Sequence, residues 1–326
     1  MGQRAPRASF RKIFRIPSQA VGAGRAVALA MLVGCCLISC DRAAPKSASS
    51  SADARLTQPT VASLVPTATD LILGMNAASH LVAVSNWDAP RPQIDRLPRV
   101  GDYRSIDWER ITQLRPNLLI VQFRPDKMPH GLEDRAGALG IKLVNITNNS
   151  LADLFATLDQ LGDALGERTK SDAASAALKK QLDAVQSRMA GEPRVRTLIT
   201  RTESSRLACV GGANYLDDVL TLAGGDNVLK GGDNSYPEID RERLLALNPD
   251  VVIVLLPSSP PQGVKQAEEF WRSVPQVEAV KNNRVHILTD SYVLLGSLSL
   301  GKVAQQFAEI LHPSSPTTRP TTIGRP

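Results

Sequence analysis

The sequence predicts an α/β protein of two lobes with largely parallel sheets, joined by one long rigid α-helix, with a ligand cleft between the lobes. Three observations predict this fold class. A phrase of the sequence occurs twice, strand and helix signals alternate in two blocks at residues 59–149 and 194–312, and a long helical pattern lies between the blocks. Such alternation is typical of parallel sheets covered by helices.

The repeated phrase is SIDWERITQLRPNLLIV at residues 105–121 and EIDRERLLALNPDVVIV at residues 238–254. Aligned from Ile106 and Ile239, eight of sixteen positions are identical, at an offset of 133 residues. Solenoid repeats have shorter periods and need at least three copies. The phrase therefore indicates one supersecondary unit used once in each lobe.

Each copy predicts a loop, a short helix, a turn and a buried strand. Asp107 and Asp240 are good N-cap residues, because a short carboxylate accepts hydrogen bonds from the first helical turn. Pro116 and Pro249 end the helices, since proline disfavours helical conformation in the residue before it. The apolar runs LLIV and VVIV that follow are typical of strands buried on both faces.

The other elements follow in chain order. Residues 59–149 hold the strand signals VASLV, LVAVS and KLVNI, a helix opened by Thr67 with Asp70 three residues on, and a helix near residues 130–139. Residues 194–312 hold the strand signals VRTLIT, LACV and VHIL, a helix at 214–222 ended by Gly224 and Gly225, a helix near 264–273 and a final helix.

Residues 150–193 carry the pattern of the joining helix. From Leu151 to Met189 apolar residues keep helical spacing, and no proline interrupts them. Gly162 and Gly166 only weaken the pattern. About 40 helical residues would span roughly 60 Å. Loops facing each other across two lobes joined in this way would form a natural ligand cleft.

Residues 1–39 predict a lipoprotein signal peptide. Six basic residues precede or begin the apolar stretch AVALAMLVGCCLIS, which is too short to span a bilayer comfortably. The stretch ends in Leu37-Ile38-Ser39, which together with Cys40 resembles a bacterial lipobox, so Cys40 is predicted to carry the lipid. Residues 40–58 then form a flexible tether and residues 313–326 a disordered tail. The alternative, an N-terminal membrane anchor, also places the body outside the cytoplasm.

Charge, cysteine and histidine content exclude several function classes. The chain has 38 Lys and Arg against 32 Asp and Glu, but six of these bases lie in the leader, so the mature chain is neutral and nucleic-acid binding has no support. Only Cys209 remains as a free thiol, which fits a small buried residue. Four scattered histidines argue against a bare-metal receptor. No catalytic motif such as a nucleophile elbow or a P-loop is present, so we predict no enzyme.

Several longer motifs resemble the substrate-binding proteins of ABC importers for vitamin B12 and ferric siderophores. They are TVASLVPTATDLILGMNAASHLVAVSN, LPRVGDYRSIDWERITQLRPNLLIV, GGANYLDDVLTLAGGDNV and SYPEIDRERLLALNPDVVIV, within a resemblance that covers about residues 59–311. The resemblance implies two α/β lobes bridged by a rigid helix, with a ligand held between them. It also implies a monomer that works with ABC permease and ATPase subunits, and no cofactor other than the cobalt or iron chelate that it carries.

The resemblance also implies ligand contacts. Tyr103 and Tyr236 precede the two repeated helices, one in each lobe, and aromatic faces suit a large and mostly neutral ring system. In the family an aromatic residue is often followed by Cys-Asp-Tyr-Pro, from which the Trp-Asp-Ala-Pro after Asn86 departs. The Pro-Arg pair that is common after the last pocket loop is replaced by Leu298 and Ser299. The alternative is that the tyrosines pack their own loops. The predicted contacts are Trp87, Tyr103, Arg104, Tyr215, Tyr236, Asp290 and Tyr292.

Glu109 and Glu242 match the two exposed glutamates that, in the family, pair with arginines of the permease. The alternative is that each acid only complements its helix dipole, which is worth about 0.3–1 kcal/mol. An acid at the same place in both lobes favours a two-point docking contact.

The ligand is left open between several chelates. Strongly anionic ferric complexes would favour several arginines in the cleft, but the sequence offers only Arg104 near the candidate pocket. This favours a corrinoid such as cobalamin, followed by a less charged ferric siderophore. Haem is a third candidate, because Tyr103 or Tyr236 could ligate its iron. Two different classes of protein also stay open. One is a structural lipoprotein without a ligand, and the second is a nitrogenase-like oxidoreductase, whose cluster cysteines this chain lacks after processing.

Overall fold

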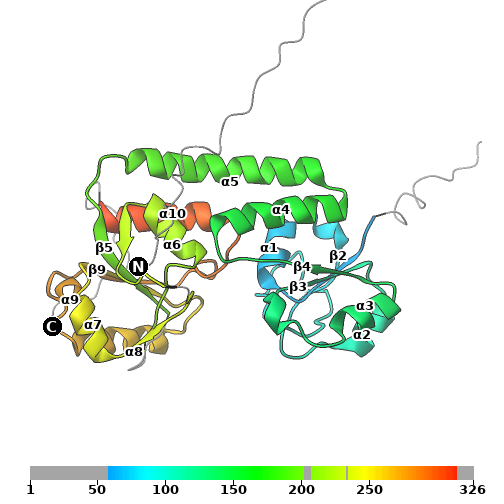
Figure 1. Cartoon of the computed structure of the whole chain (residues 1–326), viewed down its shortest axis with the longest axis horizontal. Helices are drawn as coiled ribbons and strands as arrows, with labels where there is room; N and C mark the ends of the chain where they lie inside the picture. Colours follow the sequence, from blue (N-terminus) through cyan, green and yellow to red (C-terminus); the bar gives the residue numbers. More distant parts are fainter. Residues whose placement is uncertain (1–57, 202–206, 233, 314–326) are drawn as a thin grey trace, which may run out of the picture. The chain divides into compact units, whose positions relative to one another are not determined.

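The structure is a computed structural model that describes residues 58–201, 207–232 and 234–313 (Figure 1). The predicted signal peptide, the lipidation of Cys40, the tether up to residue 57 and the tail after Pro313 lie outside the described residues. Within the described part of the chain, no helix is long and apolar enough to cross a membrane.

The N-terminal lobe has a parallel four-stranded sheet in the order β2-β1-β3-β4, as the alternating pattern predicts. Its strands are β1 (Val61–Ser63), β2 (Leu81–Ala83), β3 (Leu118–Val121) and β4 (Lys142–Asn145), and its helices are α1 (Pro66–Gly74), α2 (Trp108–Leu114) and α3 (Leu132–Ala138). The prediction that Thr67 opens α1 is wrong. Val65 is the N-cap and Pro66 the first helical residue, because the fixed φ of proline suits that position.

The C-terminal lobe has a second parallel sheet in the order β10-β9-β5-β7 and a small antiparallel pair, β6 with β8. Its elements are β5 (Val195–Thr200), β6 (Leu207–Ala208), α6 (Tyr215–Leu222), β7 (Gly225–Asn227), β8 (Glu238–Ile239), α7 (Arg241–Leu247), β9 (Val251–Leu255), α8 (Pro261–Arg272), α9 (Glu278–Lys281), β10 (Val285–Leu288) and α10 (Leu300–Leu311). Strands β7 and β8 were not predicted, because neither is an apolar run.

The repeated phrase forms the same unit in both lobes, as predicted. Asp107 and Asp240 each accept a hydrogen bond from the backbone N–H three residues on, at 3.0 and 2.8 Å. Helices α2 and α7 end at the left-handed residues Arg115 and Asn248, with φ of +46° and +41°, directly before the prolines. The strands β3 and β9 are buried along their whole length.

The prediction of one long joining helix is wrong. The stretch forms two helices, α4 (Leu151–Leu165) and α5 (Arg168–Arg188), which pack against each other. Gly166 ends α4 with φ of +69°, a left-handed conformation that glycine adopts without a steric penalty. Apolar spacing cannot reveal this reversal, because the pattern keeps a helical period on both sides of it.

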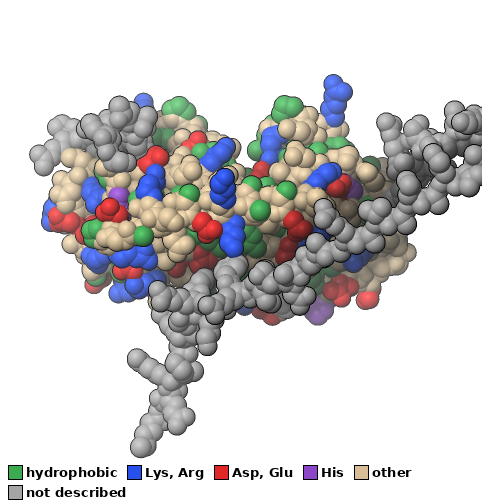
Figure 2. All heavy atoms as spheres, turned by 90° about the horizontal axis from the view of Figure 1, so that it is seen from above, with side chains coloured by type: hydrophobic (Ala, Val, Ile, Leu, Met, Phe, Trp, Pro, Cys, Tyr) green, Lys and Arg blue, Asp and Glu red, His purple; other side chains and the backbone are tan. Residues whose placement is uncertain are grey.

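Helix α5 nevertheless connects the lobes. It packs against α4 and also against α6 and α10 of the C-terminal lobe (Figure 1). One apolar core contains Leu158 of α4, Leu182 of α5, Ile120 of β3 and Ile253 of β9. Seen from the side on which α5 lies, basic and acidic side chains are interspersed over the surface (Figure 2).

Candidate functional site

Trp87 and Tyr103 are large apolar side chains that stand out in solvent, with 62% and 54% of their surface exposed. Trp87 lies in the loop after β2, and Tyr103 lies in the loop before α2. The two loops are joined by backbone hydrogen bonds, from Val100 N to Val84 O at 3.1 Å and from Asn86 N to Gly101 O at 2.9 Å. The structure therefore brings these two predicted contacts together in the N-terminal lobe.

Asp102 connects the same two loops through its carboxylate. One of its oxygens accepts hydrogen bonds from the backbone N–H groups of Arg104 at 2.8 Å and Ser105 at 3.2 Å. The pKa of Asp102 is lowered, chiefly by the Arg104 hydrogen bond, with contributions from Ser105 and from the side chains of Trp87 and Asn86. A charged carboxylate thus stabilises the arrangement of both aromatic residues.

Arg104 holds the ring of Tyr103. Its Nε donates to the Tyr103 hydroxyl oxygen at 2.9 Å, and its guanidinium carbon lies 5.3 Å from the ring centroid. At an exposed site such a cation–π contact contributes about 0.5–1 kcal/mol. Tyr103 and Arg104, both predicted contacts, are therefore presented as one unit.

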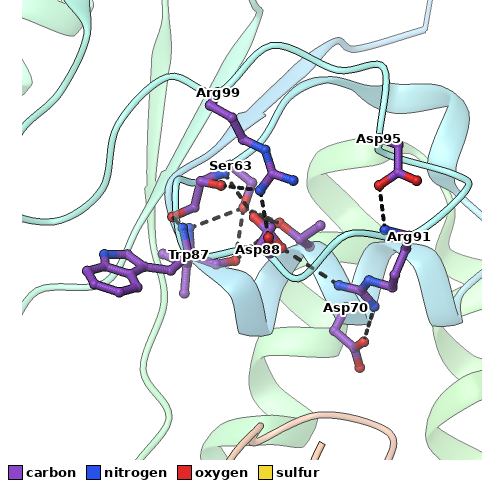
Figure 3. Close-up of polar contacts among 10 residues, drawn as sticks. Ser63, Asp70, Trp87, Asp88, Arg91, Asp95 and Arg99 are labelled. Atoms are coloured by element: carbon purple, nitrogen blue, oxygen red, sulfur yellow. Dashed lines mark hydrogen bonds and ion pairs between the residues drawn. The ribbon is translucent and has the colours of Figure 1, made fainter. Parts of the chain in front are cut away.

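Trp87 is held by a buried polar network that sequence reasoning missed (Figure 3). Oδ2 of the buried Asp88 accepts from Ser85 N at 2.8 Å and from the Thr69 hydroxyl at 3.1 Å. Nη1 of Arg99 donates to the carbonyls of Ser85 and Asp88, both at 2.7 Å. The sequence does carry a signal for this network. Asp88 follows a strand and lies two residues before Pro90, and aspartate at such a place often accepts hydrogen bonds from the backbone of its own turn.

Tyr236, the predicted contact of the C-terminal lobe, is half-buried and pairs with a cation. The guanidinium carbon of Arg201 lies 4.9 Å from the centroid of its ring. Sequence reasoning missed Arg201, which directly follows β5. Ligand-binding loops lie at the carboxyl ends of parallel strands, so the place of Arg201 directly after a predicted strand could have marked it as a candidate ligand contact.

Asp290 and Tyr292 lie in the loop after β10 and share one partner. Nε2 of Gln306 donates to Asp290 Oδ2 at 3.0 Å and to the Tyr292 hydroxyl at 3.3 Å. The ammonium of Lys302 lies 5.7 Å from the Tyr292 ring centroid. The pKa of Tyr292 is raised by partial burial and, less strongly, by the charge of Asp290. These two predicted contacts are therefore brought together.

Tyr215 lies in the core, with only 4% of its surface exposed. Its hydroxyl donates to the carbonyl of Leu294 at 2.7 Å, and burial raises its pKa well above the usual value, with a smaller effect from Tyr236. The hydrogen bond supports the loop that carries Tyr292. This burial favours a supporting role over the direct ligand contact that the sequence predicted.

Glu109 and Glu242 occupy matching exposed positions in the first turns of α2 and α7. Neither carboxylate forms a salt bridge with a described residue, and Glu109 accepts only a 3.5 Å hydrogen bond from Gln113 of its own helix. Both charges are therefore available to a partner.

The described residues include no group of three or more His, Cys, Asp or Glu side chains arranged to hold a metal ion. Cys209 is buried as predicted, and burial raises its pKa to about 12. A thiol with so high a pKa stays protonated and unreactive at neutral pH.

Residues 61–292 match the model of a protein family described as periplasmic binding protein. The chain belongs to this family. It is 25% identical over 233 residues to a vitamin B12-binding protein of Vibrio campbellii, which covers 72% of this chain and 82% of that relative. The predicted kinship with substrate-binding proteins of importers is thereby confirmed.

Solved structures of periplasmic binding proteins share the fold. A periplasmic heme binding protein from Pseudomonas aeruginosa superposes with a TM-score of 0.68 at 22% identity, covering 81% of this chain and 96% of that one. A periplasmic vitamin B12 binding protein from Vibrio cholerae gives 0.66 at 20% identity, covering 78% and 96%. The predicted class of two α/β lobes with parallel sheets is confirmed.

Proteins of the periplasmic binding protein family bind substrates for transporters outside the cytoplasm, and in general they are not enzymes. The arrangement here suits binding of that kind. The N-terminal lobe presents Tyr103 beside Arg104, and the C-terminal lobe presents Tyr236 beside Arg201 and Tyr292 beside Lys302. Such a surface can bury a large ring system while contacting polar groups at its edge.

Proposed function

We propose that this periplasmic binding protein captures a metal chelate between its lobes and delivers it to an ABC permease, while the lipid on Cys40 holds it at the membrane. The observation that carries the proposal is the exposure of Trp87 and Tyr103 on loops fixed by Asp102. Large aromatic side chains that are exposed and yet held in place are typical of a binding surface.

A corrinoid such as cobalamin is the chelate we favour, with a less charged ferric siderophore next. The vitamin B12-binding relative supports this choice. In the proposed complex Trp87 and Tyr103 cover one side of the ring system, and Tyr236 and Tyr292 cover the other. Most of the binding free energy would then come from buried apolar area, at roughly 25 cal/mol per Å² before the cost of association.

Haem is a second candidate, which the geometry of Tyr103 favours. The hydroxyl oxygen of Tyr103 accepts a hydrogen bond from Arg104, and a cationic donor of this kind stabilises negative charge on a ligating phenol oxygen. A haem complex should then show a tyrosinate absorption band that Tyr103→Phe removes. Haem binding without that band would rule out this mode.

Ligand binding can be tested with residues 41–326, in which Cys40 is absent. A Trp108→Phe background leaves the exposed Trp87 and the buried Trp271 as fluorophores. We expect saturable one-to-one quenching by cyanocobalamin, a ferric siderophore or haem, with a Kd of micromolar or tighter, and calorimetry should confirm it.

Variants separate the candidate surface from general damage. Tyr103→Ala should weaken binding about tenfold or more, because it removes both ring area and the Arg104 contact. Phe270→Leu, a half-buried aromatic on α8, is the control and should leave Kd within about twofold. No binding to any of the three chelates would reject the proposed function.

We also propose that Glu109 and Glu242 dock to cationic side chains of the permease. Their matching places and their lack of salt bridges with described residues support this role. Glu109→Lys combined with Glu242→Lys should reduce ligand uptake at least about tenfold, with ligand Kd unchanged. Glu133→Lys, in the first turn of α3, is the matched control for the helix dipole. Normal uptake by the double variant would exclude docking through these residues.

A further inference from the structure

We infer that Asp88 is a positioning residue for ligand binding, which fixes the loop that presents Trp87 and acts on the ligand only through that indole. The inference rests on the proposed function, because it assigns Trp87 to the ligand surface. It concerns a residue that contacts neither solvent nor ligand, since its side chain is fully buried.

Asp88 ties the loop to the first strand and helix of its lobe (Figure 3). Its Oδ2 accepts from the backbone N–H of Ser85, at the start of the loop, and from the hydroxyl of Thr69 on α1. The same hydroxyl lies 3.0 Å from the Ser63 hydroxyl at the end of β1. The carboxylate therefore connects the loop to two elements of the core.

The backbone on both sides of Trp87 is clamped as well. Nη1 of Arg99 contacts the carbonyl oxygens of Ser85 and Asp88, which bracket Trp87 in the chain. The N–H of Trp87 donates to the Ser85 hydroxyl at 3.1 Å. The indole itself extends away from this network (Figure 3). The backbone that carries the indole is thus held by contacts that the ring does not make, in addition to the interaction of the indole with Asp102.

The cluster keeps a buried charge that is only partly compensated. Nη2 of Arg91 lies 3.7 Å from Asp88 Oδ1, beyond hydrogen-bond distance, while its Nη1 bonds Asp70 at 2.5 Å. Oδ1 of Asp88 and Nε of Arg91 have no hydrogen-bond partner among the described residues. Burial raises the pKa of Asp88. The hydrogen bonds from Ser85 and Thr69 and the charges of Arg91 and Arg99 act against this burial cost. Because one of these bonds comes from α1 and not from the loop itself, the carboxylate joins the loop to the core and does more than close a turn.

Asp88→Asn tests the inference in the full chain kept in detergent solution, with Asp70→Asn as the matched control. An amide at position 88 offers only a neutral oxygen to Ser85 and Thr69, so both hydrogen bonds that hold the loop lose the charge that strengthens them, and its NH2 group faces the Arg91 guanidinium. Asp70 binds the same guanidinium, but among the described residues no hydrogen bond joins it to Ser85, Trp87 or Asp88. With cyanocobalamin and haem as probes, we expect Kd to rise about tenfold for Asp88→Asn and less than about twofold for Asp70→Asn.

A double-mutant cycle distinguishes positioning from general destabilisation. In a Trp87→Ala background, Asp88→Asn should change Kd by less than about twofold, because the side chain through which it acts is gone. The inference would be overturned if Asp88→Asn raised Kd equally with and without Trp87, or if it left Kd unchanged in the chain that keeps Trp87. If Asp88→Asn does not fold, Thr69→Val removes the hydrogen bond that Asp88 accepts from α1 and should raise Kd about threefold.

A ligand-free measurement separates this inference from the proposed function. In the Trp108→Phe background, iodide quenching and anisotropy report on Trp87, because Trp271 is fully buried. Asp88→Asn should alter both signals, and Asp70→Asn should alter neither. If the parent chain binds neither probe, the proposed function fails for these chelates. Unaltered quenching and anisotropy in Asp88→Asn would overturn the positioning role whether or not a ligand binds.

Discussion

At the scale of single residues, burial separates side chains that look alike in the sequence. Tyr103 and Tyr215 are both tyrosines beside glycine-containing loops, but one is exposed and the other lies in the core. Tyr215 is the first residue of α6, and its hydroxyl reaches the carbonyl of Leu294, far along the chain. Its contribution is therefore to the stability of the loop that carries Tyr292.

Tyr215→Phe should lower the free energy of unfolding by about 0.5–1.5 kcal/mol, because it removes the hydrogen bond to the partly buried Leu294 carbonyl. Urea denaturation measures this change. Ligand affinity should change by less than about threefold, whereas Tyr103→Ala should weaken binding strongly. Unchanged stability would show that the hydrogen bond contributes nothing.

The candidate site could be predicted only as far as local patterns reach. Tyr103 and Tyr236 were found because each precedes a recognisable capped helix. Asp88 and Arg201 were missed because their roles depend on partners from other elements, Thr69 of α1 for the first and Tyr236 for the second. One sequence alone does not reveal contacts between distant elements, so it does not show which polar residues will be buried together.

At the scale of elements, the two repeated units should respond alike to loss of their caps. Asp107→Ala and Asp240→Ala each remove a hydrogen bond to the first turn, so each should lower the free energy of unfolding by about 0.5–2 kcal/mol. Asn at either place can still accept and should restore most of the loss. Chemical denaturation of the four variants gives the comparison. A loss at only one cap would show that the two units are not energetically equivalent.

Strand β10 carries a histidine that should make the fold sensitive to acid. Burial, followed by the charge of Arg284, lowers the pKa of His286 to about 4. A base whose pKa is depressed in the fold stabilises it above the unfolded pKa, near 6.5, and this stabilisation is lost as pH falls towards 4.

Between pH 7.5 and pH 4.5, His286 should therefore account for about 2–3 kcal/mol of lost stability. Over the same pH interval, the free energy of unfolding of His286→Leu should therefore fall by about 2–3 kcal/mol less than that of the parent chain. Urea denaturation at the two pH values provides the measurement, and comparing the two chains cancels titrations that they share. An equal loss in both chains would mean that His286 does not titrate in this range.

At the scale of the whole molecule, the sequence predicted the two lobes but not the path of the chain between them. Alternating strands and helices define the lobes locally, and both sheets are parallel as expected. The reversal at Gly166 depends on one residue with positive φ and on the packing of α4 against α5. The outcome is that helices of both lobes share one core with α5.

A shared core predicts that the two lobes unfold together. Leu182 of α5 is buried in that core, so Leu182→Ala should cost about 2–5 kcal/mol through lost contacts and a cavity. Native-state hydrogen exchange should show the same decrease for the amides of Ile120 in β3 and Ile253 in β9, because both open by the global transition. A decrease confined to β9 would mean that the lobes are separate folding units joined only by the chain. Equal decreases would mean that α5 couples the stabilities of the two lobes. Such coupling would keep Glu109 and Glu242 at a fixed spacing, so that both acids can contact the permease at the same time.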